Sequence, residues 1–185
     1  METNNTENNT DRKKKFSSVV NAILAAVIVL LIAAILLFMF VITPMTVSGE
    51  SMLPTLEDGS RVMVLKTGYT IERGDLIVFE RPGSEVPPVK RVVGVAGDVI
   101  RFDAGENVYY VNGEPYTDFA PDGGYGSNYF AQSDASVREA LCSDGITVGE
   151  NEYFVLGDNR ATSKDSHEYG CKQADWVTGK VLLQY

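Results

Sequence analysis

An uninterrupted apolar stretch near the N-terminus constrains this chain more than any other feature. Residues 19–42 are almost entirely apolar, and Asn21 is the only strongly polar side chain among them. A helix needs about 20 such residues to cross the hydrocarbon core of a bilayer, whereas the apolar core of a cleaved secretion signal has about 7 to 15. The stretch therefore predicts one permanent transmembrane helix. Its length disfavours the alternative, a buried core helix.

Basic residues flank this stretch on one side only. Arg12 and three lysines come just before it, whereas the first basic residue after it is Arg61. Because the basic flank of a transmembrane helix stays in the cytoplasm, residues 1–18 are predicted to be cytoplasmic. Residues 43–185 are then the extracytoplasmic part. Pro44 is predicted to lie close to the helix end.

Composition excludes several classes of function. The chain has 185 residues and a net charge of −9, so it lacks the basic face that nucleic acid requires. Its two cysteines, Cys142 and Cys171, are too far apart in sequence for a Cys-x-x-Cys motif, and His167 is its only histidine. We therefore expect no metal site. Outside the membrane the cysteines are equally compatible with a disulfide and with two reduced thiols.

The extracytoplasmic part reads as short strands separated by turns. Runs rich in Val, Ile, Phe and Tyr cover residues 61–65, 75–79, 89–95, 99–102, 108–111, 152–156 and 176–183. Asn112-Gly113 is the strongest hairpin signal, and residues 135–141 form the expected helix, with Asp134 as its cap. Residues 115–149 are rich in Gly, Ser and Asp and are predicted to be a variable insertion between strands. The pattern predicts a mostly β, antiparallel domain.

Two catalytic arrangements are compatible with a serine nucleophile here. Ser51 follows the apolar stretch closely, and a serine hydroxyl needs a base to accept its proton. His167 is one candidate base. The other is Lys90, which lies in an apolar predicted strand, where burial disfavours the charged ammonium form. Taken singly, Ser51 and Lys90 are each more often structural residues.

The order of several short motifs is more informative than any one of them. After the apolar stretch come residues 51–55 (SMLPT), 73–79 (RGDLIVF), 89–98 (VKRVVGVAGD), 157–160 (GDNR) and 163–166 (SKDS). With this order and the N-terminal anchor, nearly the whole chain resembles the bacterial type I signal peptidases, which are Ser-Lys dyad serine peptidases. The resemblance is to their short, Gram-positive-like form.

The resemblance implies a role for each matching residue. Ser51 is the nucleophile and Lys90 its general base, while Ser163 orients the lysine amine. The supporting residues are an ion pair between Arg91 and Asp158, together with Asp165.

Two positions depart from the family pattern. Gly49 stands where some members have a serine that helps to bind the oxyanion, so backbone N–H groups of Ser51, Gly49 and Ser48 are expected to do this. His167 stands where members often have an arginine that pairs with Asp165; a histidine can still hydrogen-bond to that aspartate.

Contacts with the substrate and with the membrane interface are also expected, and for Met52 the resemblance implies a position near the substrate. Met52, Pro88 and Val89 are expected to contact the substrate. Val47, Met52 and Leu53 are expected to dip into the membrane interface.

The function implied is removal of signal peptides from exported pre-proteins after Ala-x-Ala-like sites. The enzyme would act in the bacterial cell membrane, near the protein-export machinery and in contact with lipid, without a cofactor. The alternatives are an inactive membrane-anchored module that binds extended segments and a peptidase dedicated to one exported substrate. A soluble, self-cleaving Ser-Lys protease is a further alternative, which the anchor and the acidic charge disfavour.

Overall fold

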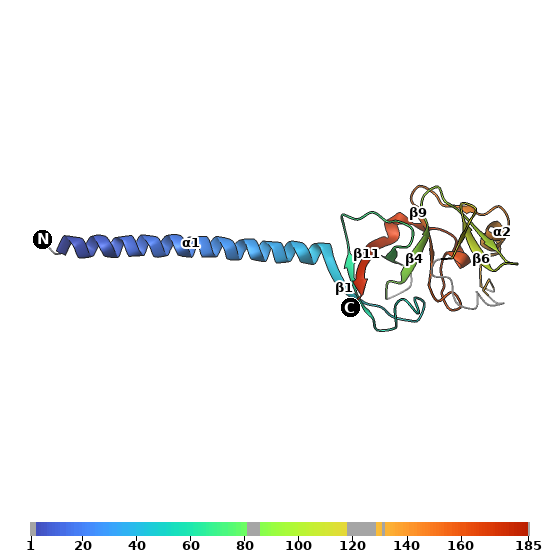
Figure 1. Cartoon of the computed structure of the whole chain (residues 1–185), viewed down its shortest axis with the longest axis horizontal. Helices are drawn as coiled ribbons and strands as arrows, with labels where there is room; N and C mark the ends of the chain where they lie inside the picture. Colours follow the sequence, from blue (N-terminus) through green and yellow to red (C-terminus); the bar gives the residue numbers. More distant parts are fainter. Residues whose placement is uncertain (1–2, 81–85, 118–128, 131, 185) are drawn as a thin grey trace. The chain divides into compact units, whose positions relative to one another are not determined.

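The computed structural model describes residues 3–80, 86–117, 129, 130 and 132–184. The chain forms two units, Met1–Val41 and Ile42–Tyr185. The first unit is the helix α1, Thr3–Val41 (Figure 1). Its segment Lys14–Val41 is long and apolar enough to cross a membrane, and its apolar side chains are exposed along the whole length. The predicted N-terminal apolar helix is therefore confirmed, and it ends three residues before Pro44.

The second unit is built from two antiparallel sheets. The larger sheet has seven strands in the order β1 Ile42–Thr46, β2 Arg61–Leu65, β11 Val177–Gln184, β3 Leu76–Phe79, β4 Val89–Gly94, β9 Glu152–Leu156 and β10 Lys172–Gln173. The smaller sheet has the order β7 Glu114–Tyr116, β6 Val108–Val111, β5 Val99–Asp103 and β8 Ile146–Thr147. The prediction of a mostly β, antiparallel domain is confirmed.

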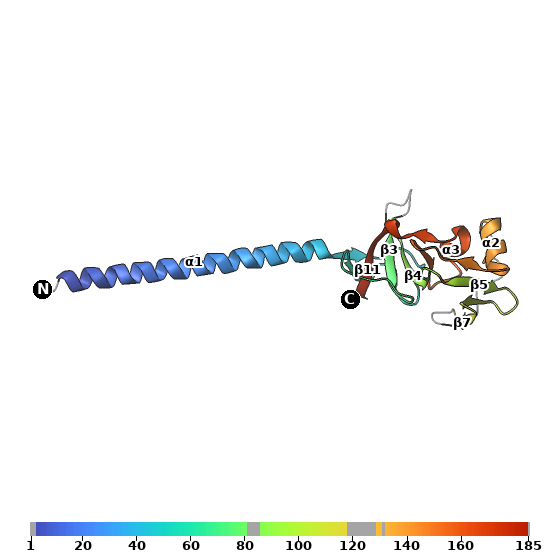
Figure 2. The same cartoon turned by 90° about the horizontal axis from the view of Figure 1, so that it is seen from above.

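Short helices complete this unit: α2 Ala135–Cys142, α3 Ser166–Tyr169 and the 3₁₀ turn Ala174–Trp176. The carboxylate of Asp134 caps α2 by accepting the N–H of Ser136, as the sequence predicts. Figure 2 shows α2 beside the smaller sheet, at the opposite end of the domain from β11. Segment 115–149 thus supplies α2 and β8, and part of β7.

Side-chain patterning explains the strand arrangement. In β2 and β5 buried residues alternate with less buried ones, as expected for strands with one face on the core. Every residue of β4 is buried, because β3 and β9 flank it within the sheet. Asn112 and Gly113 have φ values of 55° and 84°, as the predicted hairpin turn between β6 and β7 requires.

One cluster of buried apolar side chains holds the segment after β1 against the larger sheet. Val47, Met52 and Leu56 are buried against Val62 of β2 and Val78 of β3. Full burial of a side chain of this size contributes about 1.5–3 kcal/mol. The backbone between these anchors therefore has a defined path, and it carries Ser51.

Candidate active site

Ser51 and Lys90 meet although they are distant in the sequence. Ser51 lies in a turn between β1 and β2, and Lys90 lies on β4. The Nζ atom of Lys90 donates a hydrogen bond to Oγ of Ser51 at 2.5 Å. The arrangement places an amine within proton-transfer distance of a hydroxyl.

Burial sets the environment of the amine. Lys90 is 3% exposed, and its strand neighbours Val89 and Val92 are also buried. The backbone of Lys90 is paired with Ile77 of β3. A lysine in these surroundings is desolvated, which disfavours the ammonium and favours the neutral amine that a general base must be.

Residues 157–160 contact the backbone of the segment that carries Ser51. The backbone N–H of Asn159 donates to the carbonyl of Ser51 at 3.0 Å, and its side-chain Nδ2 donates to the carbonyl of Glu50 at 3.0 Å. A Cβ atom on Gly157 would lie 2.5 Å from the Ser51 carbonyl oxygen and 2.2 Å from Oγ of Ser163. Only glycine allows this approach, so the closeness of the two segments depends on Gly157.

A buried ion pair joins this segment to β4. Nε and Nη2 of Arg91 contact the two carboxylate oxygens of Asp158 at 2.8 and 2.7 Å. Nη1 of Arg91 also donates to the carbonyl of Gly74 at 2.6 Å. The bidentate geometry fixes both partners, so the residue next to Lys90 is tied to the segment that holds Ser51.

Asp165 also contacts the segment 157–160, through its carboxylate. One carboxylate oxygen accepts the N–H of Gly157 at 2.7 Å, and the other contacts Nδ1 of His167 at 2.6 Å. Complete burial raises the pKa of Asp165, but hydrogen bonds and the charge of His167 outweigh this and leave the pKa below its usual value. Asp165 is therefore held as a carboxylate. His167 is itself buried and stacks on Tyr129 at 4.1 Å between ring centroids.

Comparison with known proteins places the chain among relatives. Residues 19–185 match the family described as signal peptidase, peptidase S26. Signal peptidase IB of Staphylococcus aureus (strain COL) is 36% identical over 156 residues, covering 79% of this chain and 78% of that protein. The chain belongs to the S26 signal peptidase family.

Two further proteins are similar. Signal peptidase I of Bacillus caldolyticus is 35% identical over 160 residues, covering 80% of this chain and 82% of that protein. A crystal structure of a signal peptidase I from Enterococcus faecalis V583 aligns with a TM-score of 0.48 and 30% identity, covering 63% of this chain and 100% of that one. The family is one of peptidases, so the predicted enzyme class is confirmed: the chain is a membrane signal peptidase.

The resemblance to the type I signal peptidases implied that the hydroxyl of Ser163 hydrogen-bonds to the amine of Lys90. The structure does not show this hydrogen bond. Ser163 is buried, and its Oγ has no hydrogen-bond partner within the part of the chain that the structure describes. The orienting role of Ser163 stays a prediction.

The expected oxyanion donors require a correction. The N–H of Gly49 donates to Oδ1 of Asp58 at 2.7 Å, so it is already engaged and is not available for an oxyanion. Gly49 has a φ of +92°, which turns the chain just before Ser51. Ser48 and Ser51 both line the same groove beside Lys90, which is described below, and the N–H of Ser51 stays the predicted donor.

A groove of about 500 Å³ opens at the dyad. Pro88 lines it, as predicted, together with residues that the sequence did not indicate: Glu50, Val86, Pro87, Thr162 and Lys164. Met52 and Val89 do not line it, because both are buried in the core at 1% and 4% exposure. Their predicted contact with substrate is thus not supported. Closeness in sequence to Ser51 and Lys90 was the only sequence signal for Glu50 and Pro87.

The prediction that the side chains of Val47 and Met52 dip into the membrane interface is wrong. Val47 and Met52 pack into the core of the domain, and Leu53 is only partly exposed. The core accounts for these apolar side chains without lipid.

The structure also shows the two cysteines and the single histidine. Cys142 and Cys171 are free thiols, and burial raises the pKa of Cys171 to about 11. Within the described residues, no three His, Cys, Asp or Glu side chains are grouped as a metal site would need. His167 is paired with Asp165, whereas Ser51 is paired with Lys90.

Proposed function

We propose that Ser51 is the nucleophile and Lys90 the general base of this membrane signal peptidase. The 2.5 Å hydrogen bond between Nζ of Lys90 and Oγ of Ser51 is the observation that carries the proposal. Burial of Lys90 supports it, because burial disfavours the ammonium form, which cannot accept a proton, and favours the neutral amine, which can.

The chemistry follows from these two atoms. Oγ of Ser51 attacks the scissile carbonyl carbon while its proton passes to Nζ of Lys90. When the C–N bond breaks, Lys90 returns this proton to the leaving amine, and the acyl group remains on Ser51. A water molecule then gives a proton to Lys90 while its hydroxide adds to the acyl carbon. The bond between this carbon and Oγ of Ser51 breaks, and Lys90 returns the proton to Oγ, which restores both Ser51 and the neutral amine. The backbone N–H of Ser51 stabilises the oxyanion, and a donor of this kind contributes about 3 kcal/mol.

Ser163, Asp158, Arg91 and Asp165 are positioning residues in this proposal. Asp158 and Arg91 fix the segment 157–160 against β4, and Asp165 holds the N–H of Gly157. Ser163 would contact the lysine amine during turnover. None of these four side chains needs to touch the scissile bond.

The proposed substrates are exported pre-proteins. An extended segment would lie in the groove at the dyad, where main-chain hydrogen bonds give affinity and side pockets select small residues of an Ala-x-Ala-like site. The proposed orientation puts residues 1–18 in the cytoplasm and residues 43–185 outside. The export machinery and the lipid surface would then lie close to the groove, and the anchor would raise the effective concentration of emerging substrate.

The test is cleavage of a model pre-protein by the detergent-solubilised full chain. Ser51→Ala and Lys90→Met are compared with wild type, and Lys90→Met keeps the buried volume filled. Lys66→Met serves as the control, since Lys66 is an exposed lysine away from the groove. We expect both dyad variants to lose about 10³-fold or more in kcat, with thermal unfolding showing that they are folded, while the control keeps its activity.

Other outcomes point elsewhere. Equal cleavage by all variants would remove Ser51 and Lys90 from the mechanism and return attention to His167. A folded wild-type protein that cleaves nothing and is not labelled at Ser51 by an acylating probe would favour a binding module. Labelling at Ser51 without cleavage of the model substrate would favour a dedicated peptidase.

A further inference from the structure

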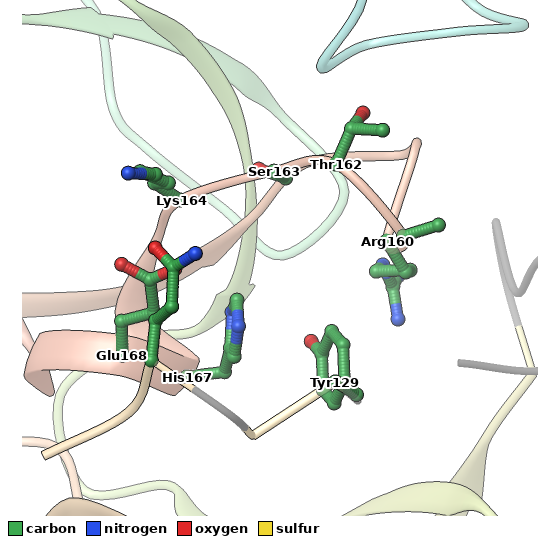
Figure 3. Close-up of a pocket in the computed structure, with 9 residues that line it drawn as sticks. Tyr129, Arg160, Thr162, Ser163, Lys164, His167 and Glu168 are labelled. Atoms are coloured by element: carbon green, nitrogen blue, oxygen red, sulfur yellow. The ribbon is translucent and has the colours of Figure 1, made fainter. Parts of the chain in front are cut away.

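A second cavity lies next to the groove at the dyad. It has a volume of about 550 Å³, and Figure 3 shows Tyr129 and His167 side by side within it. Lys164 and Arg160 lie on opposite sides of this pair in the same view. The reaction proposed above uses none of these four side chains.

The two cavities are neighbours through a shared wall. Thr162 and Lys164 line both the groove at the dyad and the second cavity. An extended peptide advances about 3.3 Å per residue. Because Lys164 belongs to this shared wall, the side chain of a substrate residue near the scissile bond can reach it.

The second cavity carries positive charge in an acidic protein. Arg160 is only 1% exposed, and its Nε is fixed by a hydrogen bond to the carbonyl of Gly157 at 2.8 Å. Lys164 adds a second cation, and Glu168 is the opposing carboxylate in the lining. Asp165 lies nearby, but its two oxygens are engaged by Gly157 and His167. The chain as a whole has a net charge of −9, so this local excess of cations is unlike its general surface.

Of the two cations, Lys164 is better placed to contact a substrate, because it lines both cavities. Its side chain is exposed, and its backbone carbonyl accepts the hydroxyl of Tyr169 at 2.7 Å, which fixes the residue at the shared wall. The structure gives its Nζ no hydrogen bond or ion pair among the described residues. The buried hydroxyl of Ser163, also in the lining, is likewise without a partner there.

We propose that Lys164 recognises an acidic side chain of the substrate beside the scissile bond. Arg160 adds to the attraction from the interior of the second cavity, and Lys164 makes the contact at its edge. This rests on the proposed peptidase function, and it adds a charge preference to the selection of small residues at the groove.

Matched substrates test this preference. A model pre-protein carries either Asp or Asn at one position at a time, on both sides of the cleavage site, and kcat/KM is measured with the solubilised full chain. At one position or more we expect wild type to favour Asp by about 5-fold, the upper range for a charge pair that solvent reaches. Lys164→Met should bring the ratio close to 1, and Lys164→Glu should invert it.

Two controls isolate the charge at Lys164. Lys66→Met changes the net charge equally at a site outside both cavities and should keep the wild-type ratio. Raising NaCl from about 50 mM to about 500 mM should reduce the preference for Asp, since salt screens exposed charges.

Failure of this inference is distinguishable from failure of the proposed function. If wild type cleaves the substrates but treats Asp and Asn alike at every position, the acidic preference is wrong. The same holds if Lys164→Met keeps the ratio. If wild type cleaves none of them, the proposed function fails. Binding of the peptides to Ser51→Ala protein, measured by fluorescence anisotropy, then decides the inference: an Asp preference that Lys164→Met abolishes supports it, and equal binding overturns it.

Discussion

Asn159 donates its backbone N–H to the backbone carbonyl of Ser51 at 3.0 Å, across more than half of the sequence. The bond joins the turn after β9 to the turn after β1. Because Arg91 ties the same region to β4 through Asp158, the positions of Ser51 and Lys90 are set by one connected group of contacts. Changes far from the scissile bond should therefore alter catalysis.

Removing the carboxylate from the buried ion pair of Arg91 and Asp158 should destabilise the domain. Asp158→Ala leaves the guanidinium of Arg91 buried without its carboxylate, so we expect a loss of about 3–5 kcal/mol in the free energy of unfolding. Urea unfolding of the full chain in detergent measures it. The partly exposed pair of Arg101 and Asp103 supplies the control, and Arg101→Ala should cost clearly less stability than Asp158→Ala. A similar small effect of Asp158→Ala would show that solvent reaches Arg91.

Gly157 should tolerate no side chain. Gly157→Ala brings a Cβ atom within 2.5 Å of the Ser51 carbonyl oxygen, and overpacking of this kind costs about 1–3 kcal/mol. Since the atoms that must move belong to Ser51 and to Ser163, which also lies at the proposed active site, we expect kcat to fall more steeply than stability. Gly105→Ala is the matched control, because its nearest contact is a side-chain atom of Asp103 at 3.3 Å. Full activity of Gly157→Ala would mean that Ser51 shifts without consequence.

The sequence allowed the main strands to be predicted because they depend on local patterns, whereas the roles of Ser51 and Lys90 came from the family resemblance and stay predictions. Runs rich in Val, Ile, Phe and Tyr marked β2 and β9 with the observed bounds, and motif order singled out Ser51 and Lys90. β1 was missed because Pro44 argues against a strand, yet an edge strand that pairs only with β2 accepts proline. β8 and β10 have two residues each, which is too short for a periodic signal.

The rest of the site depends on side-chain directions that no local pattern encodes. The N–H of Gly49 is engaged because the carboxylate of Asp58 turns toward it. Met52 is beside the nucleophile in sequence, yet it points into the core. Thr162 and Lys164 line the groove only because the segment after β9 folds back on the turn that carries Ser51.

Acid should destabilise the domain partly through Asp165. Its pKa in the folded protein lies below the usual value, so its contribution to stability is present above the unfolded pKa of about 3.9 and is lost as pH falls toward the folded pKa. Unfolding free energies of wild type and Asp165→Asn are measured from neutral pH downward. We expect the advantage of wild type over Asp165→Asn to shrink below about pH 4. A difference that stays constant with pH would mean that the carboxylate charge contributes nothing.

The two cysteines should react at different rates. Cys142 is exposed, whereas burial raises the pKa of the partly buried Cys171 to about 11. At pH 8 Cys171 is then only about 0.1% thiolate, the form that reacts. We expect iodoacetamide to label Cys142 first, as followed by mass spectrometry of the unreduced protein. Labelling of neither residue before reduction, and of both after it, would reveal a disulfide.

The strand order of the larger sheet has a consequence for the timing of activity. Ser51 lies between β1 and β2, and Lys90 lies on β4, but within the sheet these two halves are joined by β11, which inserts between β2 and β3. A ribosome makes Ser51 and Lys90 long before it makes β11, the strand that joins the two parts of the sheet on which they lie. A nascent chain therefore carries both reactive groups without the geometry to use them, and competence arrives only when β11 has been synthesised and docked.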